Sequence, residues 1–505
     1  MTNMYHSRSV VVCLIIIIVC FLTIDRCQST PLDDYVNLPD SHFEWHVINT
    51  YKQPDYVLYI LNFTSQQWFN ESFSTRSIWW HFLCITVPNS LTRPNSAFML
   101  IDGGSNNDAI PKPEDNFVAL TSMLGASSGS ISVDLQTIPN EPTRFMADPT
   151  GRNRMEDAII AWTWKSFIDN PSNPYELILM PMTKAAVRAM DAVQQFATQL
   201  GIPVPGTFVI SGASKRGWTT WTTAAVDNVR VIGAIPIVMD MANFQKSLHH
   251  HFRSLNGWTF AFKDYYELNI TLSVDNPNLP KMSEIIDPYY YFERYKKTKI
   301  LQVQSAGDEF FLLDNEETFW QELQTVTGGT YLRRLPNADH SCAGHEISLF
   351  WTMRSFYLSV YENRPFPSLH WNKTSNSTHG YIRAVVDFSY GPKPMSAFGY
   401  HARTLNDQRR DFRLLIADPN HPGKATPNPV IWFHTPVVTE GQTSTTIVYS
   451  LTIESPSNGW EGFFIQVNFA GPDGTVLELT TETQVVPDTY PTADCFNEGC
   501  FGSLV

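Results

Sequence analysis

One eleven-residue stretch, residues 207–217 (TFVISGASKRG), constrains the fold of this chain more than any other. A short run of β-branched and aromatic residues ends in a turn of small residues around Ser214, and a helix-like segment follows. This is the layout of a nucleophile elbow, in which a sharp turn between a strand and a helix holds one serine in a strained conformation. The dipole and the free N–H groups of that helix stabilise negative charge near the serine oxygen. The stretch therefore predicts an α/β fold with Ser214 as a candidate nucleophile.

Strand-like and helix-like segments alternate between residues 30 and 368, which favours a mostly parallel sheet covered by helices. Strands are expected at Tyr56–Phe63, Trp79–Val87, Phe98–Ile101, Ile131–Gln136, Thr207–Ser211, Val231–Val238, Ile300–Gln304 and Thr330–Leu335. Helices are expected from an N-cap at Thr183 to Leu200, at Asn315–Val326 and at Gly344–Tyr361. Residues 242–298 break the alternation with an aromatic-rich segment, which we interpret as an insertion or lid over the site. The pattern predicts an α/β-hydrolase domain.

The composition changes after Pro365, where Asn, Thr, Ser, Pro and Gly become frequent and apolar residues alternate over short runs. Val430–Phe433 and Phe463–Phe469 are such runs, and residues 472–474 (PDG) are a turn signal. We therefore expect residues 371–505 to form a small antiparallel β-sandwich domain with a cysteine-containing tail.

Candidate partners for Ser214 follow it in the chain. Acyl transfer needs a base to deprotonate the serine and a carboxylate to orient that base, and α/β hydrolases supply them in the order serine, acid, histidine. Asp308 comes just after the expected strand Ile300–Gln304, and His340 comes just after the expected strand Thr330–Leu335. The sequence therefore predicts a catalytic triad of Ser214, Asp308 and His340.

Other residues near these strand ends offer alternatives and complete the site. Asp314 and Asp240 are alternative acids, and His345 is an alternative base. The oxyanion donors are expected to be the backbone N–H of Lys215, directly after the serine, and a second N–H from the loop Gly103-Gly104-Ser105, for which we choose Gly104.

The elbow departs from the common pattern at one position. In G-x-S-x-G the second glycine comes two positions after the serine, where this chain has Arg216 and places Gly217 one position later. Arg216 either binds an anionic group of a substrate or forms a structural salt bridge in the turn, and we favour the salt bridge. Lys215 either raises the local positive potential or faces solvent.

No metal ion, cofactor or nucleic acid is expected as a partner. The triplet His249-His250-His251 cannot put its rings on one helix face, because helical ligand pairs are spaced by three or four residues. We interpret these histidines as lid or surface residues, and the cluster Trp79-Trp80-His81 as part of the core. The net charge of −14 argues against binding to phosphate backbones.

The first 29 residues are typical of a secretory signal peptide. Arg8 precedes an uninterrupted apolar run at Val10–Ile24, and Cys27-Gln28-Ser29 offers small residues for cleavage. The run is shorter than the roughly 20 residues of a membrane span, so we expect secretion and no span after cleavage, with an uncleaved signal anchor as the alternative.

Two further features agree with an extracellular location. Cys495 and Cys500 are expected to close a small disulfide loop, whereas Cys84 and Cys342 either pair with each other or remain buried thiols. Glycosylation is expected at the sequons of Asn62, Asn70, Asn269, Asn372 and Asn376.

Several of these segments together resemble one known family. They are the elbow at residues 212–219, residues 156–164 (EDAIIAWTW), residues 307–311 (GDEFF), residues 337–340 (NADH) and the opening at residues 31–36. These segments resemble those of the PhoPQ-activated pathogenicity-related proteins, and the resemblance extends over nearly the whole mature chain. The resemblance implies a secreted protein with an α/β-hydrolase fold, akin to the dipeptidyl-peptidase and prolyl-oligopeptidase group, and a small β-domain.

Two functions are expected, and they are compatible. The resemblance implies an extracellular autocrine signal that represses cell proliferation, with the hydrolase scaffold recognising a cell-surface receptor or a secreted protein. The triad predicts an active secreted serine hydrolase, a peptidase or an esterase, acting on a peptide or ester substrate. A purely adhesive or structural glycoprotein is a third hypothesis, which would leave the ordered triad unexplained.

Overall fold

The computed structural model describes residues 29–327 and 329–505. The predicted signal peptide, apart from its last residue, therefore lies outside the described residues. In the described part of the chain, no helix combines the length and the apolar character needed to cross a membrane.

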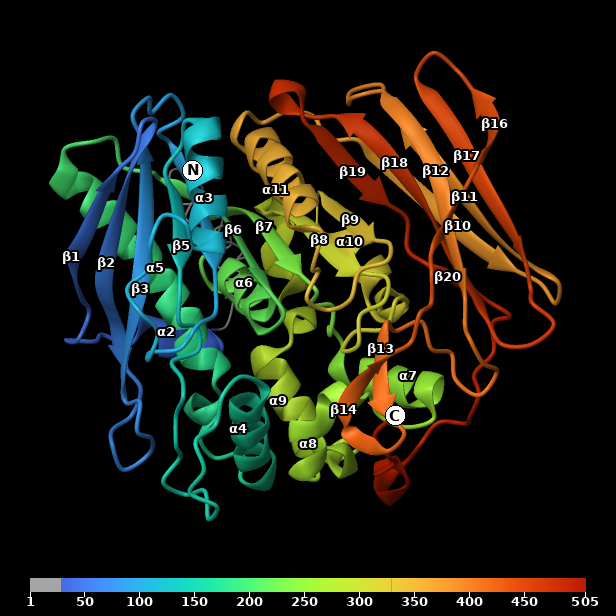
Figure 1. Cartoon of the computed structure of the whole chain (residues 1–505), viewed down its shortest axis with the longest axis horizontal. Coiled ribbons are helices and arrows are strands. Elements are labelled where there is room, and N and C mark those ends of the chain that lie inside the picture. The colour runs from blue at the N-terminus through green and yellow to red at the C-terminus, as the bar shows by residue number, and fades with distance from the viewer. Residues whose placement is uncertain (1–28, 328) are drawn as a thin grey trace, which may run out of the picture.

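Within these residues, nine strands form one twisted sheet in the order β1-β2-β3-β5-β4-β6-β7-β8-β9 (Figure 1). In this sheet order, neighbouring strands pair in antiparallel fashion from β1 to β5 and in parallel fashion from β5 through β4 to β9. The strands are β1 (Glu44–Lys52), β2 (Tyr56–Gln67), β3 (Ile78–Pro88), β4 (Ser96–Ile101), β5 (Ser132–Leu135), β6 (Thr207–Ala213), β7 (Val231–Ile237), β8 (Lys299–Ser305) and β9 (Thr330–Leu335). The predicted α/β class is confirmed, and the strand that the sequence analysis missed is β1, a largely polar edge strand.

Helices cover both faces of this sheet. Helices α2 (Pro31–Asn37), α5 (Leu179–Leu200) and α6 (Lys215–Val226) pack with one large apolar core, and α3 (Asn116–Ser128) and α11 (Glu346–Tyr361) pack with a second. The prediction of Thr183 as an N-cap was wrong, because α5 begins at Leu179. Pro181 lies in the first turn, where its missing N–H costs no helix hydrogen bond, and the Thr183 hydroxyl donates to the Leu179 carbonyl at 2.7 Å.

Short helices fill the segment between β7 and β8. They are α7 (Phe244–Leu255), η2 (Phe260–Phe262), α8 (Lys263–Glu267), η3 (Ile270–Ser273), α9 (Asn278–Ile286) and η4 (Pro288–Lys297). Several of them pack against α4 (Asp157–Asp169), and α4, α8 and α9 lie together at the lower edge of the view in Figure 1. His250 and His251 on α7 are buried, so their interpretation as surface residues was wrong. The reason is packing, because the His251 ring stacks on Trp258 and Phe262.

The rest of the chain forms antiparallel sheets that face α11 (Figure 1). One has the order β10-β11-β17-β16, from β10 (Ser368–Ser375), β11 (His379–Asp387), β17 (Thr446–Glu454) and β16 (Val438–Gln442). The second has the order β15-β12-β18-β19, with β20 also on β18, from β15 (Phe433–Thr435), β12 (Pro394–Arg403), β18 (Glu461–Ala470), β19 (Val476–Thr480) and β20 (Gln484–Val486). A separate hairpin joins β13 (Leu415–Asp418) to β14 (His421–Pro427).

Two local predictions were wrong in this half of the chain. The expected strand Val430–Phe433 does not form, because Val430 and Trp432 are buried as core residues without strand pairing and β15 begins at Phe433. The expected helix Asn315–Val326 is broken at Phe319 into η5 (Asn315–Thr318) and α10 (Trp320–Val326).

After β20 the chain returns to the segment between β7 and β8. Cys495 and Cys500 form the expected disulfide, and in the described chain Cys84 and Cys342 are separate buried thiols. The backbone N–H of Trp258 donates to the Ser503 carbonyl at 2.8 Å, and its indole N–H donates to the Cys500 carbonyl at 2.8 Å. The tail is thereby fastened to the residues around Trp258.

Candidate active site

The turn between β6 and α6 has the geometry of a nucleophile elbow. Ser214 lies between the two elements at φ 56° and ψ −126°, a conformation that costs energy for any residue other than glycine. The Ser214 N–H donates to the Ile237 carbonyl of β7 at 2.8 Å, which holds the turn against the sheet. Gly212 is required, because a Cβ there would lie 2.5 Å from the Arg216 carbonyl oxygen. A Cβ at Gly217 would lie 2.9 Å from the Ile237 carbonyl oxygen, so this glycine permits close packing on β7.

The structure brings Ser214, His340 and Asp308 together in one hydrogen-bonded chain. Nε2 of His340 lies 2.9 Å from Ser214 Oγ, and Nδ1 lies 2.9 Å from Asp308 Oδ2. Asp308 follows β8 and His340 follows β9, and the carboxyl ends of these parallel strands meet at the same edge of the sheet as the elbow. With Asp308 accepting from Nδ1–H, Nε2 is left without a proton and can accept one from the serine hydroxyl.

Neighbouring groups fix the histidine and the acid. The backbone N–H groups of Phe310 and Phe311 donate to Asp308 Oδ1 at 2.7 and 3.0 Å, and the Phe310 ring lies 4.5 Å from the His340 ring. The Glu309 carboxylate accepts the backbone N–H of His340 at 3.0 Å. Burial disfavours the charged imidazole, but the attraction and hydrogen bond to Asp308 outweigh it and raise the pKa of His340 above its ordinary value.

The alternative acids and the alternative base lie elsewhere. Asp314 is buried between His250 and Arg410, and Asp240 accepts a hydrogen bond from Asn315. His345 is the N-cap residue of α11. Of the five candidates for base and acid, the structure therefore connects His340 and Asp308 to Ser214.

Arg216 forms a structural salt bridge, with a partner that lies far from the turn in sequence. Its guanidinium donates two hydrogen bonds to the Glu156 carboxylate, at 2.9 and 2.8 Å. Lys215 also turns away from solvent, and its ammonium lies 2.5 Å from Glu156 and 3.2 Å from Asp157. Burial raises the pKa of Glu156, but the two cations outweigh burial and hold it well below its ordinary value. No role was predicted for Glu156 from the sequence.

Glu156 shares the unusual backbone conformation of the serine. It has φ 52° and ψ −129° and precedes α4 as Ser214 precedes α6. Its backbone N–H donates to the Glu141 carboxylate at 2.7 Å. Burial and the charge of Glu156 raise the pKa of Glu141 to about 7. Two strained residues thus lie on either side of one cluster of ion pairs beside the elbow.

The loop after β4 lies next to this cluster. A Cβ at Gly103 would lie 2.8 Å from Arg216 Nη2, so a side chain there would displace the guanidinium that is paired with Glu156. Gly104 has a φ of 103°, and the N–H of Ser105 donates to Asp108 at 2.6 Å. Lys215 is the first residue of α6, where backbone N–H groups have no partner within the helix.

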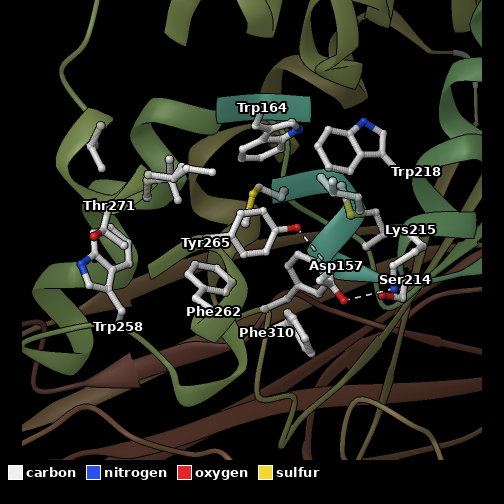
Figure 2. Close-up of a pocket in the computed structure, with 17 residues that line it drawn as sticks. Asp157, Trp164, Ser214, Lys215, Trp218, Trp258, Phe262, Tyr265, Thr271 and Phe310 are labelled. Carbon is white, nitrogen blue, oxygen red and sulfur yellow. Dashed lines mark hydrogen bonds and ion pairs between the residues drawn. The ribbon is translucent and has the colours of Figure 1, made fainter. Parts of the chain in front are cut away.

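A pocket opens beside Ser214 (Figure 2). The space in and in front of it amounts to about 630 Å³. Its walls come from α4, from α6, from the segment between β7 and β8 and from the loop after β8. The cluster Trp79-Trp80-His81 lies away from it: Trp79 and His81 are buried in the core, as expected.

The sequons differ in accessibility. Asn70, Asn269, Asn372 and Asn376 are exposed, whereas Asn62 is half-buried within β2. The four exposed asparagines can reach a glycosylating enzyme in the folded protein, and Asn62 is the least accessible of the five.

The parallel sheet, the elbow and the order serine, acid, histidine along the chain define an α/β-hydrolase-fold protein. Within that class, the chain belongs to the PhoPQ-activated pathogenicity-related protein family, whose model matches residues 32–413. The predicted family is thus confirmed.

One curated relative and several solved structures are similar to this chain. Autocrine proliferation repressor protein A of Dictyostelium discoideum is 36% identical over 475 residues, which cover 92% of each chain. Acetyl xylan esterase 1 of a Thermoanaerobacterium species is 14% identical over 65% of this chain and 93% of its own, with a TM-score of 0.42. An S-formylglutathione hydrolase of Agrobacterium tumefaciens is 13% identical over 63% of this chain and 99% of its own, with a TM-score of 0.39.

Proposed function

We propose that this protein is a secreted serine hydrolase that cleaves ester or peptide bonds with Ser214 as nucleophile, His340 as general base and acid, and Asp308 as the group that orients His340. The observation that carries the proposal is the hydrogen-bonded chain from Asp308 through His340 to Ser214 Oγ. Secretion is supported by the amino-terminal segment and by the similarity to a protein named as autocrine.

The geometry supports a two-step reaction. Ser214 Oγ attacks the carbonyl carbon of the substrate while its proton moves to His340 Nε2, and the same proton then leaves with the alcohol or amine. A water molecule next gives a proton to Nε2 and attacks the acyl group on Ser214, which releases the acid and restores the serine. Asp308 keeps its negative charge in both steps and stabilises the imidazolium that forms.

The oxyanion of each tetrahedral intermediate would be bound by backbone donors. The Lys215 N–H lies at the amino-terminal end of α6, where the helix dipole favours negative charge. The second donor is proposed to be the Gly104 N–H, because its loop lies beside the elbow through the contact of Gly103 with Arg216.

Fluorophosphonate labelling tests this function directly. The probe phosphonylates a serine whose hydroxyl is activated, so we expect the purified protein to be labelled once per chain and Ser214→Ala to abolish labelling. Ser341→Ala is the matched control, because Ser341 is exposed on the loop beside His340 and should leave labelling unchanged. Thermal unfolding monitored by circular dichroism shows whether each variant is folded. A folded wild-type protein that is not labelled would refute the assignment of Ser214.

A second function is favoured by a different observation, the 36% identity to autocrine proliferation repressor protein A over 92% of both chains. We propose that the protein also represses proliferation, as an extracellular signal recognised through its surface. Wild-type and Ser214→Ala protein, added to dividing Dictyostelium discoideum cells, should slow the rise in cell number equally. A signal that depends on hydrolysis would instead be lost in Ser214→Ala, and no slowing by wild-type protein would refute this second function.

A further inference from the structure

The pocket beside Ser214 has one polar end and a long apolar body. It extends from Ser214 toward Trp258 and Thr271, which lie at the opposite end of the residues drawn in Figure 2. The apolar body includes Trp164, Trp218, Met239, Trp258, Phe262 and Phe310. An apolar wall of this extent binds hydrocarbon and excludes charge, because an ion buried there without a partner loses its hydration.

The polar end is electrically balanced by the protein itself. Asp157 and Lys215 are the charged side chains among the described lining residues, and they pair with each other at 3.2 Å. The Tyr265 hydroxyl donates to Asp157 at 3.1 Å, and Figure 2 draws this bond and the ion pair of Asp157 with Lys215. Glu156 forms ion pairs with both Lys215 and Arg216. A substrate ammonium would therefore compete with Lys215 for Asp157, and a substrate carboxylate would compete with Asp157 for Lys215. The pocket favours an uncharged group.

The far end of the pocket is preformed and closed. Trp258 is fully buried, and Ser503 and Cys500 of the carboxyl-terminal tail accept its two N–H groups, each at 2.8 Å. The His251 ring stacks on Trp258 and on Phe262, with centroids 5.7 and 4.9 Å apart. These contacts hold Trp258 and Phe262 in their places in the pocket wall.

We infer that this pocket binds the acyl group of the substrate, and that the acyl group is an uncharged, medium-length apolar chain. The inference rests on the proposed hydrolase function. Ser214 Oγ bonds to the carbonyl carbon and forms a tetrahedral intermediate. Its collapse breaks the C–O bond of the ester, and the alcohol leaves with the serine proton through His340 Nε2. The alcohol must depart before water takes its place beside His340, and a group held at the closed end of the pocket could not leave past the acyl-enzyme. The acyl group, which stays until the second step, therefore fits the closed pocket.

Ester hydrolysis with a constant leaving group tests the inference. We would measure kcat/KM for the p-nitrophenyl esters of acetate, butyrate, octanoate and succinate, the last carrying a free carboxylate. We expect octanoate to exceed acetate by at least about tenfold, since each buried methylene adds to binding, and succinate to fall at least about tenfold below butyrate. Equal rates for acetate and octanoate, or a preference for succinate, would overturn the inference.

A substitution in the wall of the pocket tests whether the preference for octanoate over acetate arises in this pocket. Ile270 lines the pocket next to Thr271, and changing it leaves the sequon Asn269–Thr271 intact. Ile270→Phe should lower the ratio of kcat/KM for octanoate to kcat/KM for acetate at least about tenfold, whereas the volume-conserving Ile270→Leu should change that ratio by less than about threefold. Equal losses for both esters in folded Ile270→Phe would overturn the inference. If that variant does not fold, the ester series on the wild-type protein decides alone.

Labelling separates this inference from the proposed function. The same preparation is treated with a fluorophosphonate probe that has a short alkyl group. Labelling at Ser214 without a preference for octanoate would overturn the pocket assignment and leave the hydrolase function standing. Absence of labelling in folded protein would overturn the hydrolase function and the pocket assignment with it.

Discussion

His340→Ala should lower kcat/KM for a p-nitrophenyl ester on the order of 10⁶-fold while the protein remains folded. The imidazole lies 2.9 Å from Ser214 Oγ, and in its absence no base takes the serine proton. The loss should be about as large as that from Ser214→Ala, and the double variant should be little worse than either, because the two side chains act as one unit. The measurement is a rate comparison across the two single variants and the double variant.

His345→Ala is the matched control for this experiment. His345 is the next histidine along the chain and precedes α11 without a side-chain capping bond, so its removal should change the rate by less than about twofold. Activity that survives in His340→Ala and disappears in His345→Ala would transfer the base to the second histidine.

Asp308→Asn should lower kcat about 10⁴-fold by reversing the tautomer of His340. The N–H groups of Phe310 and Phe311 both donate to Oδ1, so the asparagine oxygen stays in that place. Its NH₂ group then replaces Oδ2, which lies 2.9 Å from Nδ1 of His340, while Oδ1 lies at 3.0 Å. An NH₂ donor beside Nδ1 favours the tautomer that carries its proton on Nε2, where the imidazole can no longer accept the serine proton.

The pH profile gives this variant a second readout. Asp308 raises the pKa of His340, and only neutral His340 can act as the base, so wild-type activity falls as the pH drops through that raised pKa. Without the carboxylate the pKa of His340 is lower, and the residual activity of Asp308→Asn should persist to lower pH than that of the wild-type protein. A profile that does not move would mean that another group controls the ionisation.

Asp240→Asn is the matched control for Asp308→Asn. Burial disfavours the charged form of the Asp240 carboxyl and raises its pKa well above its ordinary value, so a neutral amide suits the same buried place. Asn315 donates to one of its oxygens, and an asparagine oxygen can accept the same bond. We expect unchanged kcat and an unchanged melting temperature, and a large loss of kcat would point to Asp240 as part of the machinery.

The sequence predicted the parts of the site whose residues are neighbours in the chain or come just after the end of a strand. The elbow was readable because a strand, a turn of small residues and a helix follow one another within a dozen residues. Asp308 and His340 were readable because the carboxyl ends of parallel strands share one edge, so residues just past two strands lie near a third. The strands β6 and β9 were also found close to their true limits, whereas the start of α5 was predicted too late.

Other features depend on contacts that no local pattern carries. Arg216 finds its partner in Glu156, which lies on a different loop and leaves no periodic signal in the sequence. The pocket wall comes from short, irregular helices whose aromatic residues pack in three dimensions and not at a fixed spacing. Trp432 reads as part of a strand because it is apolar, yet it is buried by contacts with Phe412 and Phe464.

The carboxyl-terminal tail also determines at which stage of synthesis the pocket can form. Trp258 obtains its hydrogen-bond partners from Cys500 and Ser503, which a ribosome adds more than two hundred residues after it has added Trp258. The sheet and the elbow can form on the growing chain, since domains tend to fold as their residues emerge. The end of the pocket around Trp258 has to wait until residues 500–503 have been made, so a shorter nascent chain carries Ser214 without these contacts to Trp258.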